Sequence, residues 1–233
     1  MIRPPVAKTA CMNEVYVAAL YAQKYGDISL IYGEAGLGKT FSLKHFSKSN
    51  DVIYVELRDC DKSTKGVCER ILDAIGKSRR GNDRILVNTI INYLKDHPKL
   101  IIIDEAQHLL IKAIENLRAI NDATETGIVL CGNPTVYDQM HGRGQAHFAQ
   151  LYSRIGIRRS IQTPDIQDVK SIFEPYNLDT DSIRFLHNLS LQWGGIRNCI
   201  KIFNMAFEMA QKMEEPLSVG HLETAYDLRN GNQ

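Results

Sequence analysis

The sequence lacks the features of a membrane, secreted or zinc-binding protein. No apolar run approaches the about 18 residues that a membrane-spanning helix needs, and no basic-then-apolar leader is present, so we expect a cytoplasmic protein. The five cysteines are odd in number and form no C-x-x-C pair, which argues against a disulfide framework or a zinc site. A net charge of +1 gives no global sign that nucleic acid or a membrane surface is a partner.

The sequence does contain a phosphate-binding loop. Residues 33–40 read Gly-Glu-Ala-Gly-Leu-Gly-Lys-Thr and fit the template G-x-x-x-x-G-K-[ST], between an apolar run and a stretch with helical spacing. Glycines allow successive backbone N–H groups to face one anion, and the helix N-terminus adds its dipole. Lys39 supplies a mobile positive charge for the outer phosphates, and the Thr40 hydroxyl can hold Mg²⁺. The predicted nucleotide contacts in the loop are Gly33, Glu34, Ala35, Gly36, Leu37, Gly38, Lys39 and Thr40.

Apolar runs that alternate with helical spacing predict an α/β fold with a parallel sheet. The expected strands cover residues 28–32, 51–57, 100–103, 127–132 and 155–161. A helix capped by Asn13 is expected before the first strand, and a helix after the third strand is expected to bury Leu110. Beyond residue 163 the spacing predicts only helices, over 165–173, 180–191, 196–213 and 218–229. We expect Trp193, the single tryptophan, in the core of this small helical domain.

Three polar residues follow two of the predicted strands, and in a parallel sheet such strand ends share one edge with the loop after the first strand. Asp104 and Glu105 come directly after residues 100–103, and Asn133 follows 127–132. We predict that Asp104 holds Mg²⁺, that Glu105 polarises the attacking water, and that Asn133 hydrogen-bonds the γ-phosphate or the water. The alternatives are two solvated acids at a strand end and an ordinary Asn-Pro turn.

These motifs occur in the order found in AAA+ ATPases, which the chain resembles from about Asn13 onward. The order continues with Ser153-Arg154 and with Gly194-Gly195-Ile196-Arg197. The motif Ile-Asp-Glu-Ala-Gln-His-Leu at 103–109 is most similar to that of the DNA-transposition branch, the target-selection ATPases of the phage Mu B, TnsC and TniB type.

The resemblance implies a P-loop fold with a five-stranded parallel sheet flanked by helices and a small C-terminal helical lid. On this basis we expect an N-terminal arm over 1–12, an ATP- and Mg²⁺-binding α/β domain over 13–163 and the lid over 164–233. The resemblance further implies that Asn133 is a first sensor and that Arg154 is an arginine finger reaching a neighbour's nucleotide. Arg197 in the lid would be a second sensor that contacts ATP, although its Gly-Gly-Ile-Arg signature is a variant. Arg158 is the next candidate for the finger.

Basic residues after the second strand are candidate contacts to DNA. They lie in two loops that also carry hydroxyl groups, on the side where relatives line a central channel. These candidates are Lys62, Lys65, Lys77, Arg79 and Arg80. A solvated basic turn is the alternative. Because no aromatic residues are interleaved for base stacking, we expect contacts to the duplex backbone with weak sequence preference.

The resulting hypothesis is an ATPase that oligomerises on duplex DNA, as a ring or a helical filament, and recruits or regulates a transposase. A replication initiator, a helicase loader or a secretion-associated ATPase would use the same machinery with another partner. A superfamily-2 helicase needs a second motor lobe, for which the roughly 70 residues after Thr163 are too few. A small-molecule kinase would not need Asn133, Arg154 and Arg197 in series.

Overall fold

The computed structural model describes residues 6–141 and 154–231. The chain divides into two compact units. The first, here called the lid unit, comprises Met1–Asn13, Ala35–Gly38 and Gln162–Gln233, and the second, the sheet unit, comprises Glu14–Glu34 and Lys39–Ile161. No helix among the described residues is both long enough and apolar enough to cross a membrane.

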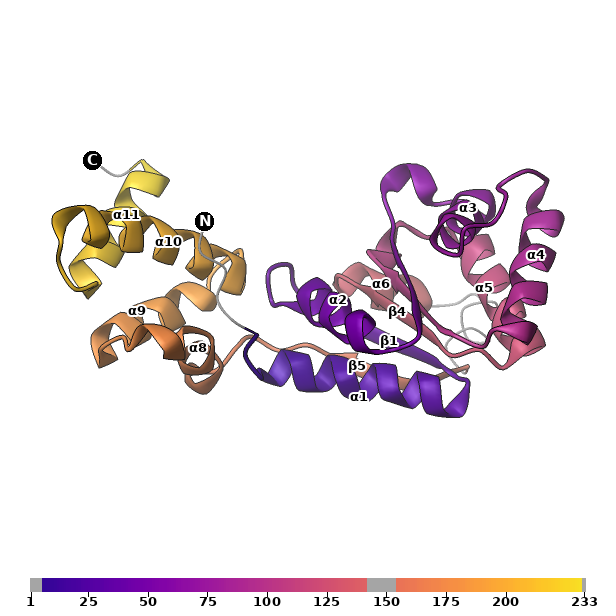
Figure 1. Ribbon diagram of the computed structural model, residues 1–233, viewed down its shortest axis with the longest axis horizontal. Helices are drawn as coiled ribbons and strands as arrows, with labels where there is room; N and C mark the ends of the chain where they lie inside the picture. The colour runs from indigo at the N-terminus through magenta and orange to yellow at the C-terminus, as the bar shows by residue number, and fades with distance from the viewer. Residues whose placement is uncertain (1–5, 142–153, 232–233) are drawn as a thin grey trace. The chain divides into compact units, whose positions relative to one another are not determined.

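Five parallel strands form the centre of the sheet unit, in the order β2-β3-β4-β1-β5. Figure 1 labels β1, β4 and β5. The strands are β1 (Ile28–Tyr32), β2 (Val52–Glu56), β3 (Leu100–Asp104), β4 (Ile128–Gly132) and β5 (Ile155–Ser160). Leu130 of β4 lies opposite Leu30 of β1 and opposite Ile103 of β3, so these three central strands end at the same edge. The prediction of a five-stranded parallel sheet is confirmed.

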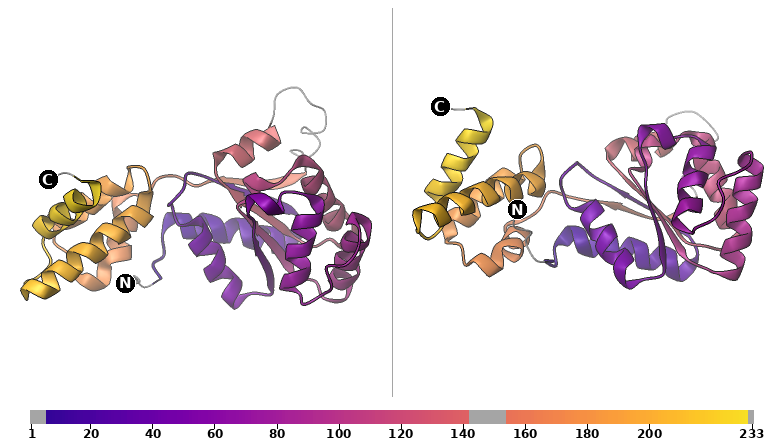
Figure 2. Two further views of the ribbon diagram at one scale, coloured as in Figure 1. Left: turned by 90° about the horizontal axis from the view of Figure 1, so that it is seen from above. Right: turned by 45° about the horizontal axis from the view of Figure 1, so that its top comes forward.

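Helices cover both faces of this sheet (Figure 2). Those of the sheet unit are α1 (Ala10–Tyr25, whose first four residues are assigned to the lid unit), α2 (Lys39–Ser49), α3 (Thr64–Ala74), α4 (Asp83–Asp96), α5 (Ile111–Thr124) and α6 (Pro134–His141). Two 3₁₀ turns, η1 (Asp59–Asp61) and η2 (Ala106–His108), follow β2 and β3. The α3, α4 and α5 helices pack on one face, and α1 and α2 lie on the other.

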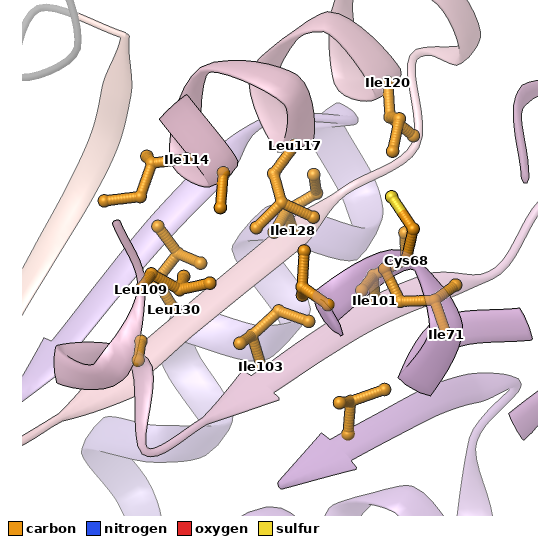
Figure 3. Close-up of a cluster of buried hydrophobic side chains, with 14 of the residues drawn as sticks. Cys68, Ile71, Ile101, Ile103, Leu109, Ile114, Leu117, Ile120, Ile128 and Leu130 are labelled. Carbon is orange, nitrogen blue, oxygen red and sulfur yellow. The ribbon is translucent and has the colours of Figure 1, made fainter. Parts of the chain in front are cut away.

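β3 and β4 are buried on both faces, and β3 is apolar up to its last residue, Asp104. Every residue of both strands is buried, and alternate side chains point to opposite faces. Ile101 and Ile103 therefore meet α3 and α5, while Ile102 faces the other layer. Figure 3 shows this cluster, with its labelled members Cys68, Ile71, Ile101, Ile103, Leu109, Ile114, Leu117, Ile120, Ile128 and Leu130.

Three local predictions are wrong. The first helix begins at Ala10 instead of after Asn13, because the Thr9 hydroxyl accepts the Met12 N–H at 3.2 Å and caps the helix earlier. Leu110 is 51% exposed, since it precedes α5 and only its backbone is used by the helix. Lys65 lies in the first turn of α3 and not in a loop.

The lid unit is helical after residue 162. It contains α8 (Ile166–Phe173), the 3₁₀ turn η3 (Glu174–Tyr176), α9 (Thr180–Ser190), α10 (Gly195–Met213) and α11 (Val219–Asn230). Its core includes Phe173, Leu186, Phe203 and Leu222, all fully buried. Trp193 is 96% exposed, so its predicted place in this core is wrong. It lies in the turn between α9 and α10, while the inward positions of α10 belong to smaller residues of the helix itself.

Candidate active site

The phosphate loop joins the end of β1 to the start of α2. Gly36 has a φ of 86° and Gly38 a φ of 101°, the left-handed region in which glycine is favoured. Gly33 is buried, and a Cβ atom at this position would lie 2.7 Å from the carbonyl oxygen of Ile161, so no larger residue fits. The loop backbone therefore has the turns that an anion-binding loop requires.

The charge of Lys39 is directed at its own loop. Lys39 Nζ donates to the carbonyl oxygens of Gly33 and Glu34, each at 2.7 Å. Thr40 follows in the first turn of α2 and is half-buried. A bound phosphate would replace two neutral carbonyl acceptors with anionic oxygens, and charge-assisted hydrogen bonds are the stronger ones.

Replacing Lys39 with alanine should abolish the thermal stabilisation that ATP gives. In the wild type, ATP at about 100 times its dissociation constant adds about 2.7 kcal/mol of stability. For a chain of this size that raises the melting temperature by about 5–11 °C. Lys48→Ala, an exposed lysine at the other end of α2, is the matched control and should keep the full shift. A full shift in Lys39→Ala would contradict the role of this lysine, and no shift in the wild type would contradict nucleotide binding.

Asp104 is a buried carboxylate with both oxygens engaged. It is 1% exposed at the end of β3, where Oδ2 accepts the Tyr54 hydroxyl at 2.8 Å and Oδ1 accepts the Glu105 N–H at 2.9 Å. Burial, followed by the charge of Asp104, raises the pKa of Tyr54, so its hydroxyl stays protonated as a donor. Tyr54 thus fixes the orientation of the carboxylate, and its position on β2, two residues before Glu56, places it beside β3.

Glu105 adopts a backbone conformation that is rare for a residue with a side chain. Its φ is 57° and its ψ is 38°, in the left-handed helical region. This turn directs the chain from β3 into η2 immediately after Asp104. The Glu105 carboxylate accepts the side-chain amide of Gln107 at 2.5 Å. Backbone strain of this kind clusters at functional sites, where the surrounding contacts hold it in place.

Asn133 caps the helix that follows β4. Its Oδ1 accepts the backbone N–H of Thr135 at 3.0 Å and the Thr135 hydroxyl at 2.5 Å, at the start of α6. The ordinary turn role is therefore present. It fixes the side-chain orientation, and the Nδ2 group, which has no hydrogen-bond partner among the described residues, is left as a donor for another acceptor.

The structure brings Lys39, Asp104, Glu105 and Asn133 to the carboxyl edge of the sheet, but it places Arg154 at the opposite edge. Arg154 is exposed in the turn before β5, and the next residue, Ile155, lies opposite Ile28 at the start of β1. Arg158 is half-buried in the middle of β5.

The remaining predicted residues lie outside the group at the sheet edge. Arg197 is exposed in the first turn of α10, in the lid unit. The basic residues after β2 are exposed, and three of them pair with acids: Lys62 with Asp59 at 3.7 Å, Lys65 with Glu69 at 3.9 Å and Arg79 with Asp73 at 3.1 Å. Lys77 Nζ lies 5.7 Å from the centre of the Tyr93 ring. Arg80 is exposed in the same turn.

A family model for an AAA domain matches residues 22–140, just over half of the chain. The chain belongs to the AAA family. A second model, for the C-terminal part of the Mu B transposition protein, matches residues 153–228 of this AAA ATPase. Together the two matches confirm the predicted AAA+ ATPase and its resemblance to the Mu B branch.

Curated relatives of this AAA ATPase carry names from DNA transposition. The Mu-like prophage FluMu DNA transposition protein B of Haemophilus influenzae is 29% identical over 203 residues, which cover 83% of this chain and 70% of the relative. The ATP-dependent target DNA activators B of Escherichia phages D108 and Mu are each 25% identical over 230 residues, covering 96% of this chain and 73% of each relative.

Solved structures confirm the fold of the AAA ATPase. Domain III of the Thermotoga maritima replication initiation protein DnaA matches with a TM-score of 0.62 and 16% identity, over 94% of this chain and 92% of that one. The Thermotoga maritima RuvB branch migration motor matches with a TM-score of 0.58 and 16% identity, over 94% of this chain and 68% of that one. A structure of Drosophila ORC bound to DNA matches with a TM-score of 0.64 and 14% identity. This match covers 96% of this chain and 62% of that one.

Sequence reasoning missed the roles of Tyr54 and Gln107. The signal for Tyr54 was weak: a tyrosine two residues before the end of a strand is ordinary, and its partner Asp104 is 50 residues away. Gln107 lies in the motif at 103–109 that carried the family resemblance, but the motif alone does not predict which groups the Gln107 amide contacts.

Proposed function

We propose that this chain is a Mg²⁺-dependent ATPase of DNA transposition, which assembles on duplex DNA in its ATP-bound form and recruits or regulates a transposase. The pair of family matches supports this most strongly, because an AAA domain over 22–140 is followed by a Mu B C-terminal match over 153–228. The relatives' names, DNA transposition protein and ATP-dependent target DNA activator, support the same function.

The residues at the sheet edge supply the groups that ATP hydrolysis needs. Lys39 exchanges its hydrogen bonds to the loop carbonyls for hydrogen bonds to the outer phosphates. Asn133 Nδ2 donates to the γ-phosphate or the attacking water. Glu105 accepts a hydrogen bond from the attacking water and polarises it towards the γ-phosphate. Since hydrolysis has little covalent chemistry for the protein to perform, positioning and charge account for most of the rate.

The oxygen ligands fit Mg²⁺. Thr40 and Asp104 offer a hydroxyl and a carboxylate, and among the described residues no group of three or more His, Cys, Asp or Glu side chains could hold a metal by itself. Mg²⁺ is commonly held by one or two protein oxygens together with substrate phosphates and water. When bound, the ion would neutralise charge that develops on the phosphates.

The remaining parts of the proposal concern the chain's organisation. We assign the arm to residues 1–12, the nucleotide-binding domain to 13–163 and the lid to 164–233. Arg197, on the first turn of the lid helix α10, would contact ATP as a second sensor. The chain would form a ring or helical filament of identical subunits, with Arg154 acting on the neighbouring subunit.

The basic residues after β2 can exchange their acidic partners for DNA phosphates at little cost in free energy. The pairs of Lys62, Lys65 and Arg79 are largely exposed, and exposed ion pairs contribute about 0–1 kcal/mol. Arg79 lies in the basic turn over 76–82, in which Lys77 and Arg80 are also exposed. Exposed positive charge of this kind gives binding that depends on salt and little on sequence.

DNA binding should require ATP and should weaken steeply as salt rises. If about four phosphates are neutralised per subunit, the slope of log affinity against log salt should be near −3.6 per subunit. Replacing Lys77, Arg79 and Arg80 together by alanine should bring the slope to about −0.9. The matched control replaces three exposed lysines elsewhere on the sheet unit, Lys24, Lys48 and Lys95, and should keep the wild-type slope.

The outcome also separates the proposed function from its alternatives. A salt-independent affinity, or a wild-type slope in the triple variant, would place the DNA contacts elsewhere. ATP-dependent DNA binding without any effect on a transposase would favour a replication or helicase-loading role.

A further inference from the structure

The Gln107 side chain connects two parts of the candidate site that are distant in sequence. Its Nε2 group donates to the Glu105 carboxylate at 2.5 Å, and its Oε1 atom accepts the backbone N–H of Asn133 at 3.2 Å. Gln107 lies in the 3₁₀ turn after β3, whereas Asn133 follows β4, 26 residues further on. Both ends of one planar amide are thus engaged, one by each strand end.

The contact with β4 is close. A Cβ atom at Gly132 would lie 2.5 Å from Gln107 Oε1, so a larger residue there would displace the amide from its present position. The contact with Glu105 helps to stabilise an unusual backbone, because Glu105 has a φ of 57°. A left-handed conformation is unfavourable for residues other than glycine, and a hydrogen bond to the charged carboxylate helps to hold it.

We propose that Gln107 is a positioning residue, which holds the water-polarising carboxylate of Glu105 and links it to the end of β4. The inference rests on the proposed function, since it assumes that Glu105 polarises the attacking water. Through this link, the position of Asn133, which would meet the γ-phosphate, affects the position of the Glu105 carboxylate. In this proposal Gln107 acts through Glu105 and is assigned no contact with the nucleotide or the water.

The first test replaces Gln107 with methionine, which keeps the length of the side chain and removes both hydrogen bonds. The turnover number should fall by about 10- to 100-fold, the effect of losing one hydrogen bond to a charged group. The KM for ATP and the ATP-induced melting shift should stay within about twofold of the wild type, because Lys39 and the loop are untouched. His108→Ala, in the same turn, is the matched control and should keep the wild-type rate.

A double-mutant cycle distinguishes positioning from a general structural effect. If Gln107 acts through Glu105, adding Gln107→Met to Glu105→Gln should slow single-turnover hydrolysis no further than Glu105→Gln alone. A structural defect would instead lower the rate by the same factor in both backgrounds, and that additive result would overturn the proposal. Gln107→Glu keeps the acceptor for Asn133 but sets a second carboxylate against Glu105, so it should be at least as slow as Gln107→Met.

The outcomes also separate this inference from the proposed function. If the wild type neither hydrolyses ATP nor binds DNA, the proposed function fails. If the wild type does both and the Gln107 variants turn over ATP at the wild-type rate, only the inference about Gln107 fails.

Discussion

Replacing Glu105 with glutamine should slow ATP hydrolysis by about 10²- to 10⁴-fold, the usual contribution of a general acid or base, and leave ATP bound. The substitution removes the charge that we propose polarises the water. It keeps the length of the side chain and an oxygen that can accept from Gln107. Lys39, Thr40 and Asp104 are unchanged, so the ATP-induced melting shift should match that of the wild type. The variant should therefore accumulate as ATP-bound oligomers on DNA.

Glu56→Gln is the matched control. Glu56 ends β2 directly beside Asp104, so the same chemical change is made at the same edge of the sheet. Its carboxylate is already paired with Lys44 at 2.7 Å. Hydrolysis by Glu56→Gln should stay within about twofold of the wild type, as expected for a surface substitution. Normal turnover in Glu105→Gln would show that another residue polarises the water.

The sheet and the residues at its edge were predictable because each is specified by local pattern. Continuous apolar runs identify buried parallel strands, and polar residues directly after them must lie at one edge once the strands are parallel. Asp104, Glu105 and Asn133 meet this condition. The loop before Lys39 was equally clear, and two of its glycines, Gly36 and Gly38, stand where the backbone is left-handed.

The contacts that orient these residues were not predictable, because each joins distant segments. The hydroxyl of Tyr54 reaches Asp104 only after β2 and β3 have paired, and Gln107 reaches the Asn133 backbone only after β4 is in place. The prediction that Trp193 lies in the core was wrong for the opposite reason. Hydrophobicity predicted burial, but its place in a turn between helices kept it out of the core.

Replacing Arg154 with alanine should lower ATP hydrolysis by about 10³-fold or more, the contribution of an arginine finger in other nucleotide hydrolases. ATP binding should be unchanged. Arg154 lies beside the start of β1, whereas the phosphate loop follows its end. Five residues at about 3.3 Å each separate the two by about 17 Å along the sheet. If Arg154 completes a neighbour's site and not its own, as proposed, activity should rise more than linearly with protein concentration.

Mixing two inactive variants tests this action in trans. In an assembly of Arg154→Ala and Lys39→Ala subunits, an active site forms wherever the first variant supplies the phosphate loop and the second supplies the arginine. With equal amounts and random order across head-to-tail interfaces, about a quarter of the sites are complete, so about a quarter of the wild-type activity should return. A mixture that assembles on DNA yet stays inactive, or an Arg154→Ala variant with wild-type turnover, would exclude Arg154 as the finger. Arg158→Ala would then be the variant to test, although its half-buried place within β5 gives its side chain less freedom to reach a neighbour.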